Sequence, residues 1–279
     1  MTSKQAIAAS IVLYQNDPDE VASAIESVLS ASMRVTCTVV DNSPVADLRA
    51  PVVNGGARYL FQGVNRGFGA AHNVVLRQYM DSAEYLLVMN PDIRFGPEVL
   101  PALYEFMNRN PEVGLVMPRI LYPDGSNQGL CKLLPSPADL LIRRFLGRFG
   151  ETLFSKRFED YELRHLDLSV PREIPSLSGC FMFIRAEALR KVGVFDERFF
   201  MYLEDVDLCR RIGRHYRTVL FPSVSVIHGY RKGSYRSFKL LRYHVESAVR
   251  YFSKWGWIQD HERKRLNGRI DVYEPSRGF

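Results

Sequence analysis

The stretch YLLVMNPD, residues 85–92, decides how this chain folds. Its first five residues form a compact apolar run of the length of one buried strand. The run ends at Pro91, which cannot donate a ladder hydrogen bond and holds Asn90 out of the helical region. Asp92 therefore emerges at the carboxyl end of a buried strand, where open α/β sheets bind ligands. An anionic oxygen there suits a divalent cation that carries a diphosphate, and a plain Asx turn is the alternative.

Strand and helix patterns alternate on both sides of this stretch. We expect strands over 6–14, 35–43, 58–63, 84–92 and 113–122, and helices over 17–32, 65–80 and 97–110. This alternation predicts an α/β protein with a single Rossmann-like, mostly parallel sheet flanked by helices. Beyond it we expect loops and short helices over 123–175, a strand and short helix over 174–193, a helix from Glu204, two short strand-like runs over 218–229 and a long helix over 237–254.

The composition indicates a folded protein of the cytosol. Of the 279 residues 46% are hydrophobic, and no apolar run reaches the roughly 18–20 residues of a membrane span. The first residues are too weakly apolar for a secretory signal. Four widely scattered cysteines form no CxxC pair, which favours free thiols over disulfides or a zinc site.

Polar side chains also follow the first three expected strands. Tyr14 offers a ring face, and Asp41 is suited to accept the imide N–H of a pyrimidine base, although it could merely shape the turn before Pro44. The loop that begins at Asn65 contains glycines that permit close backbone approach, and the helix after it offers free N–H groups to a phosphate. A plain helix entry is the alternative for this loop. In a doubly wound sheet these groups would converge on one crevice with Asp92.

The run MYLEDVDLCRRIG, residues 201–213, carries a second cluster of acids. Glu204 and Asp205 fall in the first turn of an expected helix, where the helix dipole favours acids whatever their role. The functional interpretation is a general base, because a sugar hydroxyl that attacks needs a carboxylate to accept its proton. The preceding aromatic residues could stack a sugar and partly desolvate that base.

Two further candidates follow in the last quarter of the chain. His228 ends a strand-like run and could be a second ligand of a metal held by Asp92, or simple polar filler. Arg231 could pair with a diphosphate or be solvated.

The net charge of +6 is concentrated at the C-terminus, where residues 228–279 hold 12 Lys and Arg against 5 Asp and Glu. The helix expected over 237–254 separates an apolar side from a basic side. The apolar side comprises Phe238, Leu241, Val245, Ala248, Val249 and Phe252, and the basic side Arg236, Lys239, Arg242, Arg250 and Lys254. Such a helix is typical of a membrane-surface anchor. In the alternative, its apolar face packs on the core.

Six motifs occur in order along the chain, at spacings compatible with one known family. They are SIVLYQND, VVDNSP, NRGFGAAHN, LLVMNPD, SGCFMFIRAEAL and VGVFDERFFMYLEDVDLCRRI, followed by His228. Together they resemble the inverting family-two glycosyltransferases of the A-type fold. Within these they are most similar to bacterial dTDP-rhamnosyltransferases of O-antigen and cell-wall polysaccharide assembly. The resemblance extends from about residue 7 to about residue 255.

This resemblance implies roles for the residues of the donor pocket. Asp41 would contact the nucleotide base, and Asn65, Gly67 and Asn73 would line the pocket. From their own chemistry, rather than from the resemblance, we expect Tyr14 and Arg231 to belong to the same nucleotide-sugar site.

It also implies roles in metal binding and catalysis. Asp92 matches the last acid of the family's Asp-x-Asp motif, and Asn90 replaces the first acid, so that Mg²⁺ or Mn²⁺ would be held less tightly. Asp205 matches the catalytic base, with Glu204 as its neighbour. His228 matches a metal-coordinating histidine of some relatives.

The expected activity is transfer of L-rhamnose from dTDP-L-rhamnose, with inversion, to a lipid-linked saccharide on undecaprenyl diphosphate. Another nucleotide sugar (UDP-GlcNAc, UDP-Gal or a deoxyhexose donor) is the alternative, and a non-catalytic protein that binds nucleotides or polyanions is a second one. We expect no nucleic-acid partner. The expected organisation is a catalytic domain over 1–235, with a nucleotide-sugar half (1–122) and an acceptor half (123–235), and a basic amphipathic helix and tail over 236–279. The expected location is the cytoplasm, at the inner face of the bacterial inner membrane.

Overall fold

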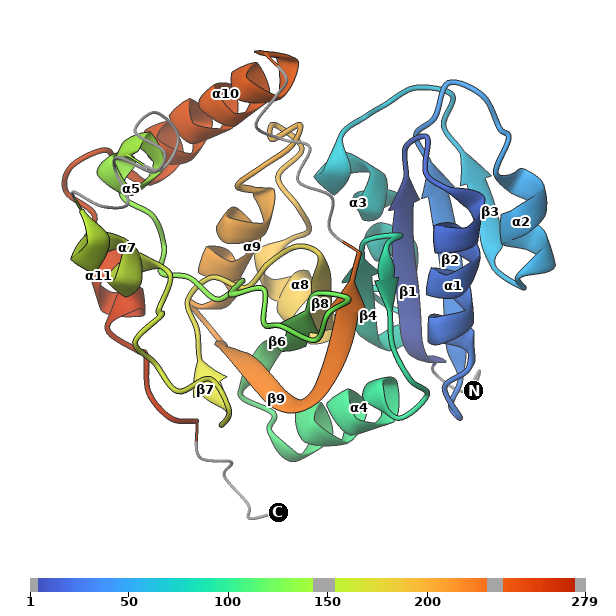
Figure 1. Ribbon diagram of the computed structural model, residues 1–279, viewed down its shortest axis with the longest axis horizontal. Helices are drawn as coiled ribbons and strands as arrows, with labels where there is room; N and C mark the ends of the chain where they lie inside the picture. Colours follow the sequence, from blue (N-terminus) through green and yellow to red (C-terminus); the bar gives the residue numbers. More distant parts are fainter. Residues whose placement is uncertain (1–4, 143–153, 230–237, 274–279) are drawn as a thin grey trace.

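A nine-stranded sheet forms the centre of the computed structural model, which describes residues 5–142, 154–229 and 238–273. The strands are β1 (Gln5–Leu13), β2 (Val35–Asp41), β3 (Arg58–Phe61), β4 (Ala83–Met89), β5 (Ile93–Arg94), β6 (Val113–Leu121), β7 (Arg172–Glu173), β8 (Phe181–Arg185) and β9 (Arg217–His228). Their order is β3-β2-β1-β4-β8-β6-β9-β5, and β7 pairs with β9 beside this path. The expected single sheet is confirmed (Figure 1).

The parallel half of the sheet consists of β3, β2, β1 and β4. Leu13 lies opposite Asp41 and Ile11 opposite Met89, so the carboxyl ends of three strands reach the same edge. The chain runs outward from β1 to β2 and β3, and then returns to the other side of β1 as β4. This reversal creates a topological switch point between β1 and β4, the usual ligand site of such sheets.

The other half of the sheet is mixed. β8 is antiparallel to both of its neighbours, β4 and β6, whereas β6 and β9 are parallel. The two strand-like runs expected over 218–229 are one strand, β9, whose pairing with β6 shifts register between Phe221 and Ser225. Pro222 lies in this interruption, since it has no N–H to donate to the ladder.

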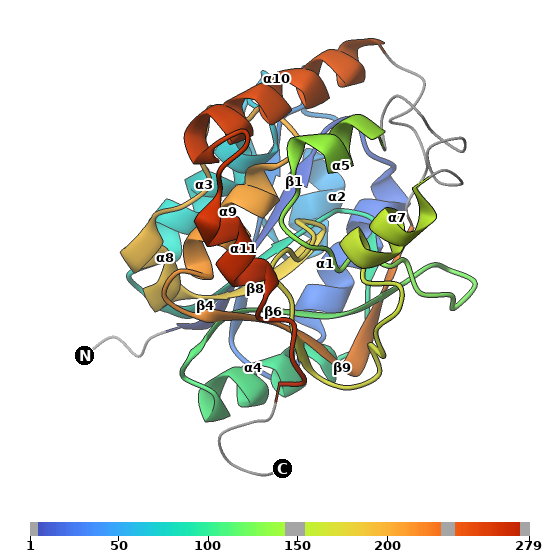
Figure 2. The ribbon, with the colours of Figure 1, turned by 90° about the vertical axis from the view of Figure 1, so that its left-hand side faces the viewer.

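Helices cover both sides of the sheet. They are α1 (Pro18–Leu29), α2 (Arg49–Asn54), α3 (Phe68–Tyr79), α4 (Val99–Arg109), α5 (Pro137–Leu141), α7 (Ser155–Tyr161), α8 (Ala186–Val192), α9 (Glu204–Ile212), α10 (Phe238–Trp255) and α11 (His261–Asn267). α3, α8 and α9 lie on one side, and α1 and α4 on the other (Figure 2). The sequence patterns did not predict α2, a single short turn of helix that contains Pro51 and two β-branched valines.

The core contains the apolar sides of all the long strands. Leu86–Met89 of β4 are fully buried, as the apolar run predicts. The four cysteines are free and buried. A second, smaller cluster joins α5, α9, α10 and α11 and comprises Leu134, Leu140, Phe199, Leu203, Val206, Tyr251, Phe252 and Leu266.

Buried charges fasten the C-terminal helices to α9. Arg210 donates to Asp260 at 2.7 Å, and their side chains are 1% and 2% exposed. Asp207, fully buried, accepts from Trp255 Nε1 at 2.8 Å and pairs with Lys254 at 2.7 Å. Lys254, placed above on the basic side of the helix, is therefore paired within the protein. A charge at this depth needs a partner, and the carboxylate of α9 supplies it.

The helix α10 packs through only part of its apolar side. Ser247, Tyr251 and Phe252 are its buried residues, whereas Phe238 is 84% exposed and Val249 47% exposed. Ser247 Oγ donates to the Met201 carbonyl, so a polar contact and two large aromatics decide which face is covered. The alternative that the apolar face packs on the core therefore holds for Phe252 and Ala248 but not for Phe238, Val245 and Val249.

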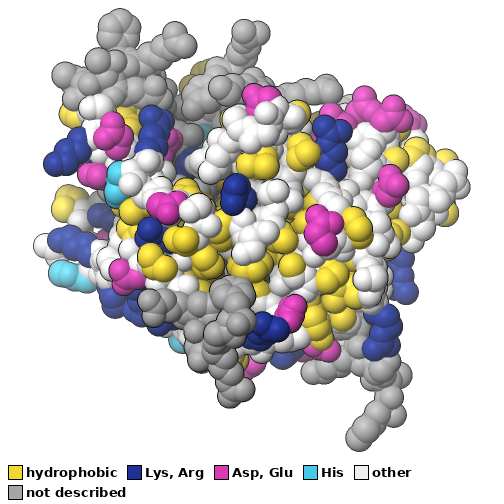
Figure 3. Space-filling model, turned by 60° about the horizontal axis from the view of Figure 1, so that its bottom comes forward, with side chains coloured by type: hydrophobic (Ala, Val, Ile, Leu, Met, Phe, Trp, Pro, Cys, Tyr) yellow, Lys and Arg dark blue, Asp and Glu magenta, His cyan; other side chains and the backbone are white. Residues whose placement is uncertain are grey.

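The two ends of the molecule expose different surfaces. α10 runs along the upper edge in Figure 1, and the underside exposes apolar side chains interspersed with charges of both signs (Figure 3). Within the described residues, no helix combines the length and apolar character needed to cross a membrane.

Candidate active site

A cleft of about 440 Å³ lies at the switch point between β1 and β4. Its wall is formed by residues that follow the parallel strands and by the entry to α3. Six residues that the sequence predicts for the site line it: Tyr14, Asn65, Gly67, Asn90, Asp92 and His228. Strand-end polar groups thus converge as the parallel topology requires.

Asp92 and His228 meet because their segments pair. Ile93 of β5 lies opposite His228 of β9, and the Gly229 N–H donates to the Asp92 carbonyl at 2.9 Å. As a result, His228 Nε2 lies 3.3 Å from Asp92 Oδ1 and 3.3 Å from Asn90 Nδ2. One carboxylate and one imidazole in a polar cleft fit Mg²⁺ or Mn²⁺ that takes its other ligands from a diphosphate and water. The described residues contain no cluster of three or more such ligands, so the protein alone makes a partial site.

Asp205 is linked to the same strand end by two residues. Its Oδ2 accepts from the Gly179 N–H at 2.9 Å, and the next residue, Cys180, accepts the Asn90 N–H at 2.9 Å. Burial, with smaller contributions from the charges of Asp92 and Asp205, raises the pKa of the Cys180 thiol to about 12. Asp205 and the segment that carries Asp92, 113 positions apart in the chain, are therefore connected through one buried dipeptide.

The adjacent acids Glu204 and Asp205 have different environments. Burial raises the pKa of both carboxyl groups, and the charge of Asp205 raises that of Glu204 further. Asp205 accepts N–H groups at both oxygens, from Gly179 and from Val206, which favours its ionised form. No described residue hydrogen-bonds Oε2 of the buried Glu204. The surroundings therefore favour the protonated form more strongly at Glu204 than at Asp205.

The loop before α9 connects Asp205 to the start of α3. Tyr202 and Leu203 both have positive φ, 72° and 66°, a strained conformation for residues with side chains. The Phe68 N–H, at the start of α3, donates to the Phe200 carbonyl at 3.0 Å. Gly67, with φ +87°, leaves room for that carbonyl, since a Cβ would overlap it. The contact with α3 and the hydrogen bond from Ser247 of α10 to the Met201 carbonyl together fix the position of this loop.

One predicted site residue has a different role. Asn73 is fully buried, receives the Phe195 N–H at 3.0 Å and donates to the Phe195 carbonyl and to Glu197. The expectation that it lines the donor pocket is wrong, because its amide is used to fasten α3 to the 195–197 segment.

Among the other predicted residues, Asp41, Glu204 and Asp205 do not line the cleft wall. Asp41 is fully buried and accepts from Tyr59 Oη at 2.6 Å and from the Ser43 N–H at 2.8 Å. Its contact with a base stays a prediction and requires Tyr59 to release it. Arg231 lies outside the described residues.

Sequence reasoning missed several residues of the cleft. Gln15, Asn42, Phe68 and Met201 contribute to its wall. Asn42 Oδ1 is buried with no hydrogen-bond partner among the described residues, so it can accept a donor from a ligand. The only sequence signal for Asn42 is its position beside Asp41 at a strand end.

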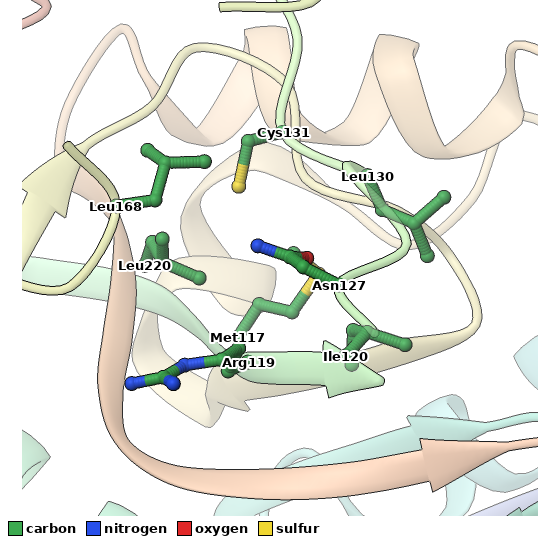
Figure 4. A pocket seen from close by; sticks show the side chains of 8 residues that line it. All are labelled: Met117, Arg119, Ile120, Asn127, Leu130, Cys131, Leu168 and Leu220. Atoms are coloured by element: carbon green, nitrogen blue, oxygen red, sulfur yellow. The ribbon is translucent and has the colours of Figure 1, made fainter. Parts of the chain in front are cut away.

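Other hollows lie apart from these acids. A groove of about 470 Å³ lies between residues 119–129 and 162–169. A small cavity of about 10 Å³ has Met117 and Ile120 of β6 below it and Cys131 above it (Figure 4). It holds at most one water, so it is a packing defect rather than a ligand site.

The comparison with known families agrees with this geometry. The model of the family "Glycosyl transferase family 2" matches residues 10–193, and this chain belongs to that family of glycosyltransferases. Over 181 residues it is 34% identical to N-acetylglucosaminyl-diphospho-decaprenol L-rhamnosyltransferase of Mycobacterium tuberculosis. That match covers 61% of this chain and 58% of the relative, less than two thirds of its length. It is 25% identical to rhamnosyltransferase WbbL of Escherichia coli, covering 79% of this chain and 81% of the relative.

Solved structures share the fold at low sequence identity. A mannosyltransferase from Pyrobaculum calidifontis, in complex with GDP-Man and Mn²⁺, has a TM-score of 0.62 at 14% identity, covering 96% of this chain and 69% of that chain. The Staphylococcus aureus protein TarS 1–349, in complex with UDP, has a TM-score of 0.56 at 12% identity, covering 94% and 70%. The expected A-type glycosyltransferase fold is confirmed.

Proposed function

We propose that this enzyme transfers L-rhamnose from dTDP-L-rhamnose to a hydroxyl of a saccharide carried on undecaprenyl diphosphate, for a cell-surface polysaccharide such as O-antigen. The observation that carries the proposal is the hydrogen-bonded connection of Asp205, through residues 179–180, to Asn90 at the end of β4, two residues before Asp92. The choice of sugar and of a lipid-linked acceptor is supported by the names of the two related rhamnosyltransferases.

Asp205 is the general base of the proposed reaction. It accepts the proton of the acceptor hydroxyl while that oxygen forms a bond to the anomeric carbon and the bond to the diphosphate breaks. Attack from the face opposite the diphosphate inverts the configuration, and no covalent sugar–enzyme intermediate is needed. Glu204, protonated beside it, adds no second negative charge to the buried pair.

The diphosphate of the donor lies, in this proposal, between the strand ends and the start of α3. Asp92 and His228 would hold Mg²⁺ or Mn²⁺, which when bound neutralises the charge on the leaving group. Asn65 and Gly67 shape the backbone around the phosphates, and Tyr14 offers its ring at the mouth of the cleft. Arg231 and Asp41 stay candidates for the diphosphate and the base.

A different nucleotide sugar is the second candidate. The structural neighbours bind GDP-Man and UDP on the same fold. None of the cleft residues named above is specific for rhamnose over another hexose. A UDP-linked sugar or another deoxyhexose donor is therefore the alternative that the first experiment has to test.

We also propose that α10 anchors the enzyme to the inner face of the cytoplasmic membrane. The exposed residues Phe238, Val245 and Val249 form a stripe beside the basic residues Arg242 and Arg250. An apolar stripe edged by cations matches an anionic lipid surface. In this proposal residues 236–279 are the anchoring segment, 1–122 bind the donor and 123–235 contribute the base and the acceptor side.

The experiment that tests the activity is a donor panel. The protein with Mn²⁺ is mixed with dTDP-rhamnose, UDP-GlcNAc, UDP-Gal or GDP-Man, its melting temperature is measured, and transfer to GlcNAc on a polyprenyl diphosphate is followed by mass spectrometry. We expect dTDP-rhamnose to give the largest stabilisation and a product heavier by one deoxyhexose. A larger shift and transfer with a UDP sugar would refute the rhamnose assignment.

A further inference from the structure

Gln128, in the connection after β6, makes three hydrogen bonds at the edge of the cleft. Its Nε2 donates to the His228 carbonyl at 2.9 Å and to the Leu121 carbonyl at 3.3 Å. Its Oε1 lies 2.8 Å from His228 Nδ1. The residue is half-buried and has no motif around it in the sequence.

These contacts determine which nitrogen of His228 carries the proton. The two backbone carbonyls can only accept, so they require the amide nitrogen of Gln128 on their side and fix the orientation of the amide. Oε1 therefore faces His228, and an amide oxygen can only accept. Nδ1 is the donor, and in the neutral ring Nε2 is then the nitrogen with the lone pair.

The lone pair of His228 faces the acid of the metal motif. Nε2 lies 3.3 Å from Asp92 Oδ1 and 3.3 Å from the Asn90 amide nitrogen, both at the wall of the cleft. A histidine that binds a metal through one nitrogen characteristically donates the other N–H to an oxygen that fixes its tautomer and its ring orientation. Gln128 occupies the position of that oxygen.

We propose that Gln128 is the positioning residue that holds His228 with its Nε2 lone pair toward Asp92 and thereby sets the affinity of this pair for Mg²⁺ or Mn²⁺. The proposal rests on the proposed function, which includes the cation. The Gln128 side chain is suited to this role because it donates hydrogen bonds to Leu121 and His228, the last residues of β6 and β9. The ring orientation therefore depends on the sheet itself.

The test compares Gln128→Leu, an apolar side chain that makes no hydrogen bonds, with Gln128→Glu, which keeps an acceptor oxygen for Nδ1 but loses the two hydrogen bonds donated to the carbonyls. Gln78→Leu, an exposed position on α3, is the matched control. Ring ¹⁵N shifts of the six histidines are recorded on the full chain at a pH where the rings are neutral, and His228→Asn assigns the signal. Mn²⁺ binding in the presence of dTDP is measured by electron paramagnetic resonance.

We expect the Nδ1–H tautomer of His228 in the wild type and in Gln128→Glu, and its loss in Gln128→Leu. We expect Mn²⁺ to bind roughly 10–100-fold more weakly to Gln128→Leu and unchanged to Gln78→Leu. An Nε2–H tautomer in the wild type overturns the proposal without any variant, even if Gln128→Leu fails to fold. Unchanged Mn²⁺ affinity in a folded Gln128→Leu also overturns it. If the wild type shows the Nδ1–H tautomer but binds no Mn²⁺, the metal site of the proposed function fails, and with it the role of Gln128 in cation binding.

Discussion

Replacing Gly67 by alanine tests the link between the donor loop and the loop that leads to the base. Gly67 has φ +87° and ψ 174°, a conformation that L residues rarely adopt. A Cβ there would overlap the Phe200 carbonyl oxygen and lie 3.0 Å from Phe200 Cα, so backbone must move. Gly193 provides a matched control. Its φ of 82° and ψ of 169° are nearly the same, but the nearest atom to an added Cβ is Arg211 Nη1, at 3.9 Å.

The magnitude follows from separating the two costs. Both substitutions lose about 1–3 kcal/mol for the backbone conformation. Gly67→Ala loses about 1–3 kcal/mol more, because overlap with a backbone atom is relieved only by shifting the loop. We expect the shift to displace Met201 and the start of α9, and a displacement of about 1 Å can lower the transfer rate about 100-fold.

The measurements are urea denaturation of both variants and their transfer rates at saturating donor. Gly193→Ala should lose stability but keep its transfer rate, whereas Gly67→Ala should lose both. Equal losses of stability in the two variants, or a normal transfer rate in Gly67→Ala, would refute the proposed contact between the two loops.

Three further predictions concern stability and membrane binding. Between pH 4 and pH 8, the free energy of unfolding of Glu204→Gln should rise relative to that of the wild type. Burial and Asp205 raise the pKa of Glu204 in the folded wild type, which therefore holds a proton that the unfolded chain releases. A difference that is independent of pH in denaturant titrations would contradict this. Asp260→Ala should lower the free energy of unfolding by about 3–5 kcal/mol, since it removes both short hydrogen bonds of a buried guanidinium and leaves it the longer contact with Glu262. Glu105→Ala, at an exposed pair on α4, should change it by less than about 0.5 kcal/mol; similar values for the two would be inconsistent with the buried ion pair. Val249→Ser should reduce flotation of the protein with phosphatidylglycerol vesicles. Val53→Ser, at a similarly exposed position on α2, should leave flotation unchanged. Equal flotation of the two variants would exclude α10 as the anchor.

Much of the fold could be predicted because its signals are local. The apolar run over 85–89 is buried along its whole length, and the alternation around it specifies the parallel half of the sheet. The same reasoning predicts that Tyr14, Asn90 and Asp92 lie at one edge of the sheet, because the carboxyl ends of parallel strands coincide. His228 joins them through its pairing with Ile93, which no local pattern indicates.

The failures have a shared physical cause, which is that a polar side chain at a strand or helix end can face either a ligand or the protein. Asn73 faces the 195–197 segment, and Asp41 is covered by Tyr59 from the next strand. Lys254 has the spacing of a surface residue, yet its ammonium group pairs with the buried carboxylate of Asp207. Gln128 has no distinctive neighbours in sequence, and its importance depends on contacts with residues 100 positions away. These outcomes depend on tertiary pairing rather than on period or composition.

The most direct measurement of the central claim is the transfer rate of Asp205→Asn, with Asp160→Asn, at an exposed position, as the control. Because a general base typically contributes about 10²–10⁴-fold, the variant should lose at least about 100-fold in kcat while its nucleotide affinity stays within a few-fold of wild type. A folded Asp205→Asn that transfers sugar at the wild-type rate would contradict the assignment of the base.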